Sequence, residues 1–508
     1  MPDRRAVRHD PVPGRPSLRR PEPRVVVVGG GIAGLAAAVL LAERGARVVL
    51  CERQRHLGGR VGGWPTRLAD GSSATMTRGF HAFFRQYYNL RRLLRRADPH
   101  GTALVGLPDY PLWHADGHRD GFAGLPAAVP WNALGFLARS PTFRWRDLRD
   151  VDSRAALPLL DVEVPRTYEE LDGLDAARYL SLLRFPGPAH ALALEVFSRS
   201  FFAHPARMSA AELVTMFHIY FLGSGEGLLF DVAADPFPHG LWEPLARYLG
   251  DLGVEVRRGT AVSAVERGGR RFVVHADEPI DADAVVLATD VGGLREVVGS
   301  SPDLGSAEWR ADIAALETAP PFLVSRYWLD RPVAPDRPGF VGTSGYGPLD
   351  NVSVLDRYEH EARAWAARTG GAVVELHGYA LPAGVDLRRE LLDQLGVVFP
   401  ETKAARVVDE RHELRSDCPL FPPGGFARRP AVVTPEPFLV LAGDLVRIDL
   451  PVALMERAAT TGFAAANALL ARWGVRGTPL WTVPTRGRVP LLRAVARRWG
   501  RNPGLETP

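Results

Sequence analysis

Cysteine and lysine are the residues that this chain of 508 amino acids has least of. It contains two cysteines, Cys51 and Cys418, and Lys403 is its single lysine. Two cysteines exclude a disulfide framework, and we predict no metal site. Because Cys51 lies in an apolar run, we expect a buried thiol without a redox role. Such sparse cysteine fits a reducing, cytoplasmic compartment.

The chain also has little that could cross a membrane. One run, Val25 to Ala42, has eighteen residues without a charge and follows an arginine-rich start. Three consecutive glycines interrupt it, which is untypical of both a signal peptide and a transmembrane helix. We therefore predict no transmembrane helix, and any contact with a membrane should be peripheral.

Positive charge is concentrated at the two ends. Residues 1–22 carry a net charge of +3 and residues 472–508 carry +7, whereas the whole chain carries +4, so the middle is acidic. Basic tails suit anionic membrane surfaces or nucleic acid. We find no aromatic-basic platform or recognition motif beside these charges, so we expect no nucleic-acid partner. The length suffices for two domains.

A strand, a glycine turn, a helix and a second strand follow one another over residues 24–60. The valines 25–28 predict a buried strand, residues 35–44 a helix, and residues 46–51 a strand that ends at Glu52. This is the spacing of a dinucleotide-binding βαβ unit.

Each glycine of the turn has a predicted task. Gly29 permits the tight turn, Gly31 leaves room for a pyrophosphate, and Gly34 allows close packing of helix and strand. The helix N-terminus offers N–H groups to the phosphates. Glu52 accepts hydrogen bonds from ribose hydroxyls and repels a phosphorylated ribose.

Two further motifs narrow the choice of nucleotide. Gly58-Gly59-Arg60 follows Glu52, and an apolar strand near the C-terminus ends in Gly443-Asp444 before a helix over residues 451–470. Both resemble motifs of FAD-dependent oxidoreductases of the amine oxidase and carotenoid desaturase type. The resemblance implies FAD, but Arg457 stands where related desaturases have a glycine. It assigns to the cofactor Gly29, Gly31, Ile32, Ala33, Gly34, Glu52, Arg53, Gly58, Gly59, Arg60, Val262, Gly443, Asp444 and Met455.

The predicted fold class is α/β, with a Rossmann-like FAD-binding domain around a parallel sheet and an inserted α+β substrate domain. The predicted segments are a disordered basic tail (1–22), three parts of the FAD-binding domain (23–100, 226–300 and 411–471), a helical substrate domain (101–225), a substrate-domain sheet (301–410) and a basic amphipathic tail (472–508).

The run from Arg78 to Asn89 resembles most closely the isorenieratene synthases, as do Phe230-Asp231-Val232. This resemblance implies that β-ionone rings of β-carotene become aromatic φ-rings, with four hydrogens removed and one methyl group moved per ring. The electron acceptor is left open. Two alternatives remain: a flavin desaturase or isomerase of a linear carotene and, more distantly, a non-catalytic prenyl-binding protein of the same fold.

The aromatisation needs a proton acceptor, and a carboxylate in an apolar pocket suits that task. Our candidates are Asp231, then Glu226, then His81. Each has an ordinary alternative: Asp231 as a turn or cap residue, Glu226 as a solvated acid in a glycine loop, and His81 as a core histidine.

The C-terminal tail contains a predicted basic amphipathic helix over residues 490–499. Leu491, Val495 and Trp499 share one face, whereas Arg493, Arg497 and Arg501 share another. We predict that this helix lies on the cytoplasmic membrane, where a carotenoid substrate resides; a solvated tail is the alternative.

Overall fold

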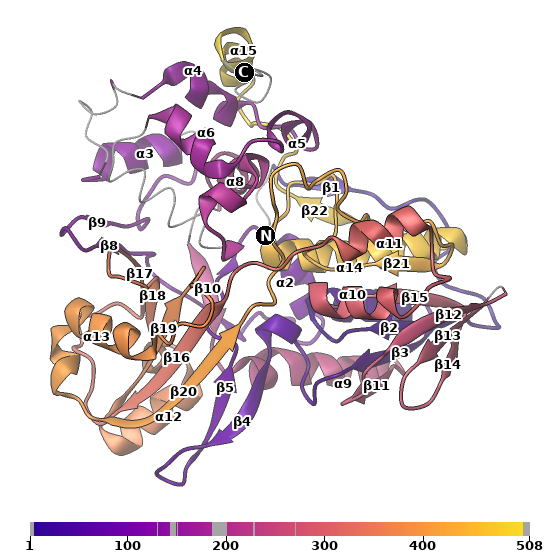
Figure 1. Cartoon of the computed structure of the whole chain (residues 1–508), viewed down its shortest axis with the longest axis horizontal. Helices are drawn as coiled ribbons and strands as arrows, with labels where there is room; N and C mark the ends of the chain where they lie inside the picture. The colour runs from indigo at the N-terminus through magenta and orange to yellow at the C-terminus, as the bar shows by residue number, and fades with distance from the viewer. Residues whose placement is uncertain are drawn as a thin grey trace.

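A five-stranded parallel sheet forms one half of the molecule, on the right in Figure 1. The computed structural model describes residues 5–129, 131–142, 149, 151–184, 201–226, 229–269 and 271–500. The sheet confirms the predicted α/β class, and its strand order is β11-β3-β2-β15-β21. Its strands are β2 (Arg24–Val28), β3 (Arg47–Glu52), β11 (Glu255–Arg258), β15 (Ala284–Leu287) and β21 (Leu439–Leu441).

One face of this sheet is covered by α1 (Ile32–Glu43), which itself packs against α14 (Leu454–Arg472). A Cβ added to Gly462 of α14 would lie 2.3 Å from the Ala33 carbonyl oxygen, so a glycine is required for this close approach. Helix α1 is buried on all sides, which is why its sequence is apolar all round. The helix α9 (Glu243–Asp251), after a π-helical turn η8 (Pro238–Trp242), also joins this core.

The other face carries a small antiparallel sheet and two helices, whose apolar side chains form a second core with the parallel strands. These elements are β12 (Ala264–Gly268), β13 (Arg271–His275), β14 (Ile280–Ala282), α10 (Val291–Gly299) and α11 (Ala307–Ala314).

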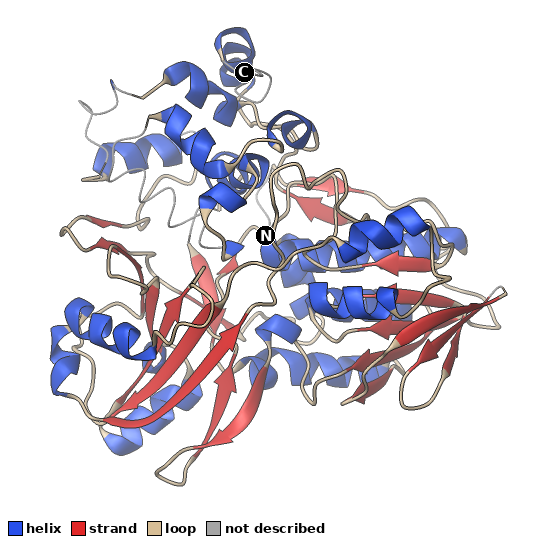
Figure 2. Cartoon of the chain, viewed as in Figure 1, coloured by secondary structure: helices blue, strands red, loops and turns tan. Residues whose placement is uncertain are grey.

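A seven-stranded mixed sheet, in the order β20-β16-β19-β18-β17-β8-β9, fills the lower left of Figures 1 and 2. Helices α12 (His360–Thr369) and α13 (Arg388–Val398) pack on its opposite faces, because Trp328 and Val373 contact the former while Tyr327 and Val374 contact the latter. The strands are β8 (Leu112–His114), β9 (Arg119–Asp120), β16 (Phe322–Leu329), β17 (Phe340–Ser344), β18 (Asn351–Val354), β19 (Ala372–Gly378) and β20 (Val407–Arg415).

The sheet is broader than predicted. Strands β8 and β9 belong to the predicted helical segment 101–225 but pair at the edge of this sheet, and β20 continues to Arg415. These short strands escape sequence analysis because β8 pairs with β17, about 230 residues away, and β9 has only two residues.

Short elements connect the two large sheets. One hairpin pairs β4 (Gly63–Arg67) with β5 (Ser73–Thr77), and β10 lies between β6 and β7 in a three-stranded sheet. The remaining elements here are η1 (Gly59–Val61), β6 (Phe83–Phe84), α2 (Tyr88–Leu94), β7 (Leu104–Gly106) and β10 (Phe230–Ala233). Within the seven-stranded half, η9 (Leu355–Arg357) leads from β18 to α12, and η10 (Pro400–Ala404) leads from α13 to β20.

The upper part of the molecule is helical, as Figure 2 shows. It contains α3 (Trp131–Arg139), α4 (Ser153–Ala156), η3 (Leu157–Leu160), α5 (Arg166–Leu171), α6 (Ala176–Leu183), η6 (Pro205–Arg207), α8 (Ala210–Phe217) and the π-helical η7 (His218–Leu222).

The N-terminal segment is ordered against the C-terminal part of the chain. Strand β1 (Val7–His9) pairs antiparallel with β22 (Leu480–Thr482), and the Arg15 N–H donates to the Gly474 carbonyl at 3.0 Å. The prediction of disorder for residues 1–22 is therefore wrong for this segment. A proline- and arginine-rich composition indicates disorder only when no distant strand supplies hydrogen-bond partners.

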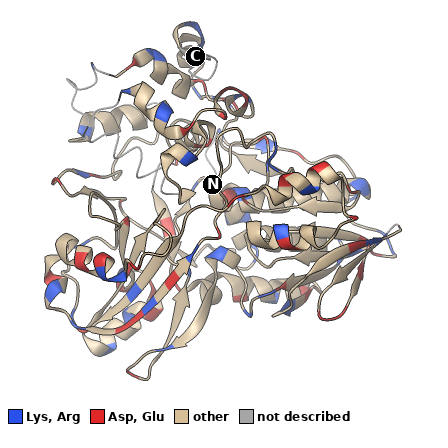
Figure 3. Ribbon diagram, in the orientation of Figure 1, with Lys and Arg blue, Asp and Glu red and all other residues tan. Residues whose placement is uncertain are grey.

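The predicted C-terminal helix is α15 (Pro490–Trp499), at the top of Figure 1, and Figure 3 shows its basic residues. Arg501, predicted on its basic face, lies outside the described residues. Within the part of the chain that the structure describes, no helix combines the length and the apolar character that a bilayer crossing requires.

Candidate functional site

The glycine turn between β2 and α1 has two positions that only glycine can occupy. Gly29 has a φ of 107°, and an added Cβ would lie 2.5 Å from the Ala288 carbonyl oxygen. A Cβ on Gly34 would lie 1.9 Å from the Gly29 carbonyl oxygen. Both glycines are therefore required by the fold itself. This agrees with the predicted tight turn at Gly29 and the predicted close packing at Gly34.

Gly31 differs from these two glycines. The one atom within 4 Å of an added Cβ is Gly59 Cα, at 3.9 Å, so the side of Gly31 faces open space. Gly31 is also the N-cap of α1, and no side chain caps this helix, so its first turn faces an anion site with its N–H ends. This space beside a helix N-terminus is the shape that a pyrophosphate requires.

Glu52 lies at the end of β3 and holds the glycine turn. Its buried carboxylate accepts hydrogen bonds from the backbone N–H groups of Gly30 at 2.7 Å and Gln54 at 2.8 Å. Burial raises the pKa of Glu52, and these two donors offset part of the rise. Its neighbour Arg53 pairs with Asp290 at 2.7 Å.

The adenine side of the predicted site approaches Glu52 through the backbone. The Thr260 N–H donates to the Glu52 carbonyl at 2.9 Å, which places the segment containing half-buried Val262 beside β3. This backbone segment therefore lies next to Glu52, as the prediction for Val262 requires.

The two other predicted FAD motifs meet the glycine turn. The Gly58 N–H donates to the Gly30 carbonyl at 2.9 Å, and Arg60 Nη2 lies 2.5 Å from Asp444 Oδ1. Burial alone would lower the pKa of Arg60, but Asp444 raises it overall. Gly443 is fixed by Thr461, whose hydroxyl oxygen accepts from its N–H at 2.9 Å. The structure therefore brings three motifs from distant parts of the chain into one site.

The start of α14 adds a buried carboxylate to this site. Met455 is half-buried in the first turn, and next to it Glu456 accepts three hydrogen bonds: from Asn89 N and Nδ2, both at 2.8 Å, and from Leu90 N at 2.9 Å. Burial raises the pKa of Glu456 to about 8, although these donors oppose the rise.

Arg457, which stands where related desaturases have a glycine, pairs with a buried carboxylate. Glu212 of α8 accepts from Arg457 Nη2 at 2.7 Å and pairs with Arg429 Nη1 at 2.7 Å, and all three side chains are buried. Burial opposes ionisation, yet the two arginines lower the pKa of Glu212 to about 2. Sequence analysis missed this triad, because its members lie on separate segments without a shared motif.

Asp231 lies on β10 and is engaged in ion pairs. Its Oδ2 accepts from Arg91 Nη2 at 2.6 Å, and Arg85 Nε lies 3.9 Å from Oδ1. This surrounding differs from the apolar pocket that we predicted, because two guanidinium groups face the carboxylate. Its role as a proton acceptor stays a prediction.

His81 lies in the segment before β6, where its ring meets the edge of Phe237 with centroids 5.5 Å apart. Glu226 lies in the turn after η7, where its N–H donates to Ser224 Oγ at 3.0 Å. His81 Nδ1 donates to the Gly79 carbonyl at 2.8 Å, so its Nε2 carries the lone pair. Burial lowers the pKa of His81 to about 4, partly offset by that carbonyl. It is therefore neutral at physiological pH.

An aromatic cluster extends from the seven-stranded sheet toward the helical part. Phe80 stacks on Phe340 with ring centroids 4.2 Å apart and meets the edge of Phe230 at 5.4 Å. Further on, Phe84 contacts Phe230 and Tyr220. Phe230 and Phe340 are buried in this core, whereas Phe80 and Phe84 are half-buried, so these two rings are the ones that an apolar ligand could reach.

A buried polar network that the sequence analysis missed lies beside Gly79. Arg326 of β16 bonds to Glu375 of β19, which also contacts His377, and His377 contacts Tyr379. The available signal was the alternation of polar residues at positions 375, 377 and 379 within an otherwise apolar strand.

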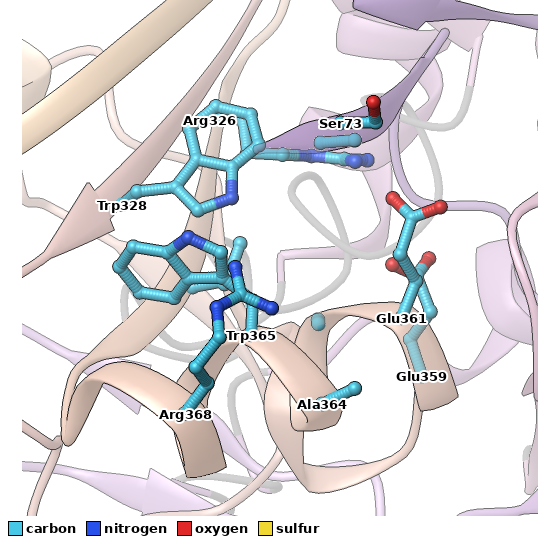
Figure 4. Close-up of a pocket in the computed structure, with 11 residues that line it drawn as sticks. Ser73, Arg326, Trp328, Glu359, Glu361, Ala364, Trp365 and Arg368 are labelled. Atoms are coloured by element: carbon cyan, nitrogen blue, oxygen red, sulfur yellow. The ribbon is translucent and has the colours of Figure 1, made fainter. Parts of the chain in front are cut away.

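A cavity of about 120 Å³ lies at the far side of this network, between β16 and α12. Figure 4 shows Glu359 and Glu361 on one side of it and the indoles of Trp328 and Trp365 on the other. Burial raises the pKa of Glu359 to about 7, although Arg326 opposes the rise. The described residues contain no cluster of three or more His, Cys, Asp or Glu side chains suited to a metal ion.

Known proteins resemble the chain over nearly its whole length. The family model described as flavin containing amine oxidoreductase matches residues 32–470. A carotenoid phi-ring synthase of Streptomyces griseus is 61% identical over 488 residues, which cover 95% of this chain and 94% of that protein. A second carotenoid phi-ring synthase, of Chlorobaculum tepidum, is 28% identical and covers 91% of both chains.

Among solved structures, wild-type putrescine oxidase bound to putrescine superposes with a TM-score of 0.65. The superposition covers 89% of this chain and 99% of that chain, at 16% sequence identity. At this level of identity the likeness concerns the fold.

Proposed function

The chain belongs to the family of flavin containing amine oxidoreductases, and from this premise we propose that it is an FAD-dependent carotenoid φ-ring synthase. The proposed reaction converts the β-ionone rings of β-carotene into aromatic φ-rings. The observation that carries the proposal is the 61% identity to the carotenoid phi-ring synthase of Streptomyces griseus over 95% of the chain. The aromatic cluster beside the predicted cofactor site supports a ring-bearing hydrocarbon as the substrate.

The residues present fit FAD. A Cβ on Gly31 would enter otherwise open space at the N-terminus of α1, which is the room that a pyrophosphate needs. We propose that Glu52 binds the adenosine ribose, that Val262 contacts the adenine, and that Arg60 with Asp444 binds the rest of the dinucleotide. When bound, the flavin would supply the hydride acceptor for both oxidations of each ring.

The chain's own part in the reaction is to hold the ring, exclude water and accept protons. Aromatising one β-ionone ring removes two hydrides and two protons and moves one methyl group to the neighbouring carbon. Phe80, Phe230 and Phe340 would exclude water from the cationic ring that each hydride loss creates.

Pigment conversion in living cells tests the proposal. We expect cells that make β-carotene to accumulate a carotenoid with aromatic end rings, identified by its absorption spectrum and mass. Cells that stop at a linear carotene should keep their pigment unchanged. Desaturation of the linear carotene, with β-carotene left intact, would instead favour a linear-carotene desaturase.

We further propose that α15 contacts the surface of an anionic membrane. Its apolar face is exposed: 73% of Leu491, 37% of Val495 and 57% of Trp499 is accessible to solvent. Arg493 and Arg497 of the opposite face pair with Asp161, which fixes the apolar face outward. Co-sedimentation with vesicles of anionic phospholipid tests this contact.

The ion pairs with Asp161 change what we expect of the basic face in membrane binding. Because Asp161 engages two of its arginines, the interaction with lipid would depend mainly on the apolar face. Trp131 and Leu134 of α3 are likewise exposed in the helical part, at 62% and 43%, and would extend the contact.

A further inference from the structure

Three polar side chains of the strand β19 and its end lie on one face of the seven-stranded sheet. Val374 and Leu376 pack in the core beneath α13, so Glu375 and His377 point to the other face. That face meets the segment before the aromatic cluster: a Cβ added to Gly79 would lie 2.6 Å from His377 Cε1. Tyr379 follows on the same side, and unlike the other two it is only half-buried.

Hydrogen bonds fix the direction of proton transfer along this row. Glu375 Oε2 accepts from Arg326 Nε at 2.9 Å and Nη2 at 2.7 Å, while Oε1 lies 2.9 Å from His377 Nε2. Burial opposes ionisation, but Arg326 and His377 lower the pKa of Glu375 to about 2. An ionised carboxylate only accepts, so His377 Nε2 carries the hydrogen.

His377 Nδ1 therefore has the lone pair. It accepts from the Tyr379 hydroxyl at 2.7 Å, and the hydroxyl oxygen in turn accepts from Asn351 Nδ2 at 3.0 Å. The Phe80 N–H also approaches His377 Nε2, at 3.2 Å, but the shorter contact to a charged carboxylate decides the tautomer. The row thus runs from a phenol through an imidazole to a carboxylate held by Arg326.

Tyr379 lies at the junction between the cofactor site and the aromatic cluster. Its ring meets Phe202 edge-on at 4.7 Å and, like Trp64, packs against the small core that contains Cys418. Burial raises the pKa of the Cys418 thiol to about 11, and nearby Arg60, the predicted FAD ligand, opposes the rise. Through Cys418, the phenol therefore borders the site that Arg60 and Asp444 form.

We propose that Tyr379, His377 and Glu375 form the proton-accepting relay of ring aromatisation. This inference rests on the proposed function. In each oxidation the ring loses one hydride, for which a bound flavin would supply the acceptor, and one proton. The electron pair of the second C–H bond stays in the ring as a new double bond, and the proton adds to Tyr379 Oη.

In the same step the hydroxyl proton of Tyr379 passes to His377 Nδ1, so that the phenol is regenerated as it accepts the proton from the ring. His377 becomes an imidazolium, whose charge Glu375 Oε1 balances. Tyr379 is the catalytic residue, whereas His377 and Glu375 are positioning residues that act through it. A phenol suffices as the first acceptor because a C–H bond next to a carbocation is strongly acidic.

Tyr379→Phe removes the acceptor while keeping the ring. In FAD-loaded enzyme with β-carotene in vesicles, we expect the formation of aromatic rings to fall about 100-fold or more. Tyr327→Phe is the matched control, because its hydroxyl donates to the Arg388 carbonyl at 3.2 Å on the opposite face of the same sheet. That control should keep the wild-type rate.

A second measurement reports on the relay without turnover. With ¹⁵N-labelled histidine at about pH 8, where an ordinary imidazole is neutral, NMR should show His377 as the Nε2–H tautomer. His377→Gln identifies its signals. In Tyr379→Phe the ¹⁵N chemical shift of Nδ1 should move toward the value of an unprotonated ring nitrogen that accepts no hydrogen bond.

The outcomes separate the relay from the proposed function. If the wild-type enzyme leaves β-carotene unchanged, the proposed function is wrong, and the relay loses the reaction that it would serve. Wild-type activity together with full activity of FAD-loaded Tyr379→Phe overturns the relay alone, as does an Nδ1–H tautomer of His377. If Asp231→Asn abolishes aromatisation while Tyr379→Phe does not, the carboxylate is the acceptor.

Discussion

The glycines of the first turn serve either the fold or the ligand, and their surroundings tell which. A side chain at position 34 would meet the backbone of Gly29, whereas a side chain at position 31 would meet almost nothing. Because Gly31 also lies at the N-terminus of α1, in the turn of a βαβ unit, the open space beside it fits a bound pyrophosphate.

Gly31→Ala should therefore give a folded protein that lacks its cofactor. We expect its FAD content, measured from the absorbance near 450 nm, to fall at least about tenfold, while the melting temperature of the apoprotein stays that of the wild type. Gly34→Ala should lower both, because overpacking costs about 1–3 kcal/mol. Gly173→Ala, exposed and without a neighbour within 4 Å, is the control. Full FAD content in Gly31→Ala would contradict the assignment.

Glu359 should make stability depend on pH. Its pKa is raised from 4.5 to about 7, so the folded protein holds a proton that the unfolded chain releases earlier. The stability that this proton provides is complete below pH 4.5 and is lost as the pH rises through about 7. As the pH rises across that window, the free energy of unfolding of Glu359→Gln should therefore rise by about 3 kcal/mol relative to that of the wild type.

Urea unfolding of both proteins at intervals from about pH 5 to 8 measures this gain. Glu308→Gln, which changes an exposed carboxyl of α11, should show a constant difference from the wild type. A constant difference for Glu359→Gln as well would show that the buried carboxyl is ionised throughout.

Sequence analysis predicted the residues of local motifs and missed those that act through long-range pairing. Gly29, Gly34 and Glu52 are recognisable because a βαβ unit imposes fixed spacing within about thirty residues. Glu375 and His377 depend on Arg326 of another strand, and Arg457 depends on Glu212, which is 245 residues away. Nothing in the chain near these residues encodes their partners.

At the scale of elements, the same difference between local and distant signals holds. Valine-rich runs predicted β2 and β3 because buried parallel strands are apolar on both faces. The three residues of β1 have no such signature, since their strand character comes from pairing with β22.

The exposed apolar face of α15 should contribute to binding of the protein to membranes. Leu491→Ser combined with Trp499→Ser should reduce binding to vesicles of anionic phospholipid about tenfold or more, because two large apolar side chains no longer enter the lipid surface. Leu414→Ser is a suitable control, since Leu414 is also exposed, at 56%, but lies on β20. Equal binding of both variants would contradict the membrane contact of α15.

At the scale of the whole molecule, the triad of Glu212, Arg457 and Arg429 joins the helical part to the FAD-binding half. Helix α8 supplies the carboxylate and α14 supplies one guanidinium, so the triad fixes one part of the molecule against the other. A buried charge cluster of this kind is costly to disrupt because the remaining charges lose their partner.

Glu212→Gln should therefore lower the free energy of unfolding by about 3–5 kcal/mol. The exposed pair of Glu317 with Arg207 provides the comparison, and Glu317→Gln should cost less than about 1 kcal/mol. Denaturant unfolding of the FAD-loaded proteins measures both values. Equal losses for the two substitutions would show that the triad is not a principal link between the two parts.

The contact between Arg60 and Asp444 has a consequence for how the protein is made. The two residues are 384 positions apart. At about 5–20 residues per second, a ribosome needs about 20 to 80 s to travel from one codon to the other. The glycine turn is therefore synthesised long before the cofactor site can close, and FAD is expected to load only onto a nearly finished chain. Apoprotein made in cells short of riboflavin should accordingly gain its cofactor when FAD is added after synthesis.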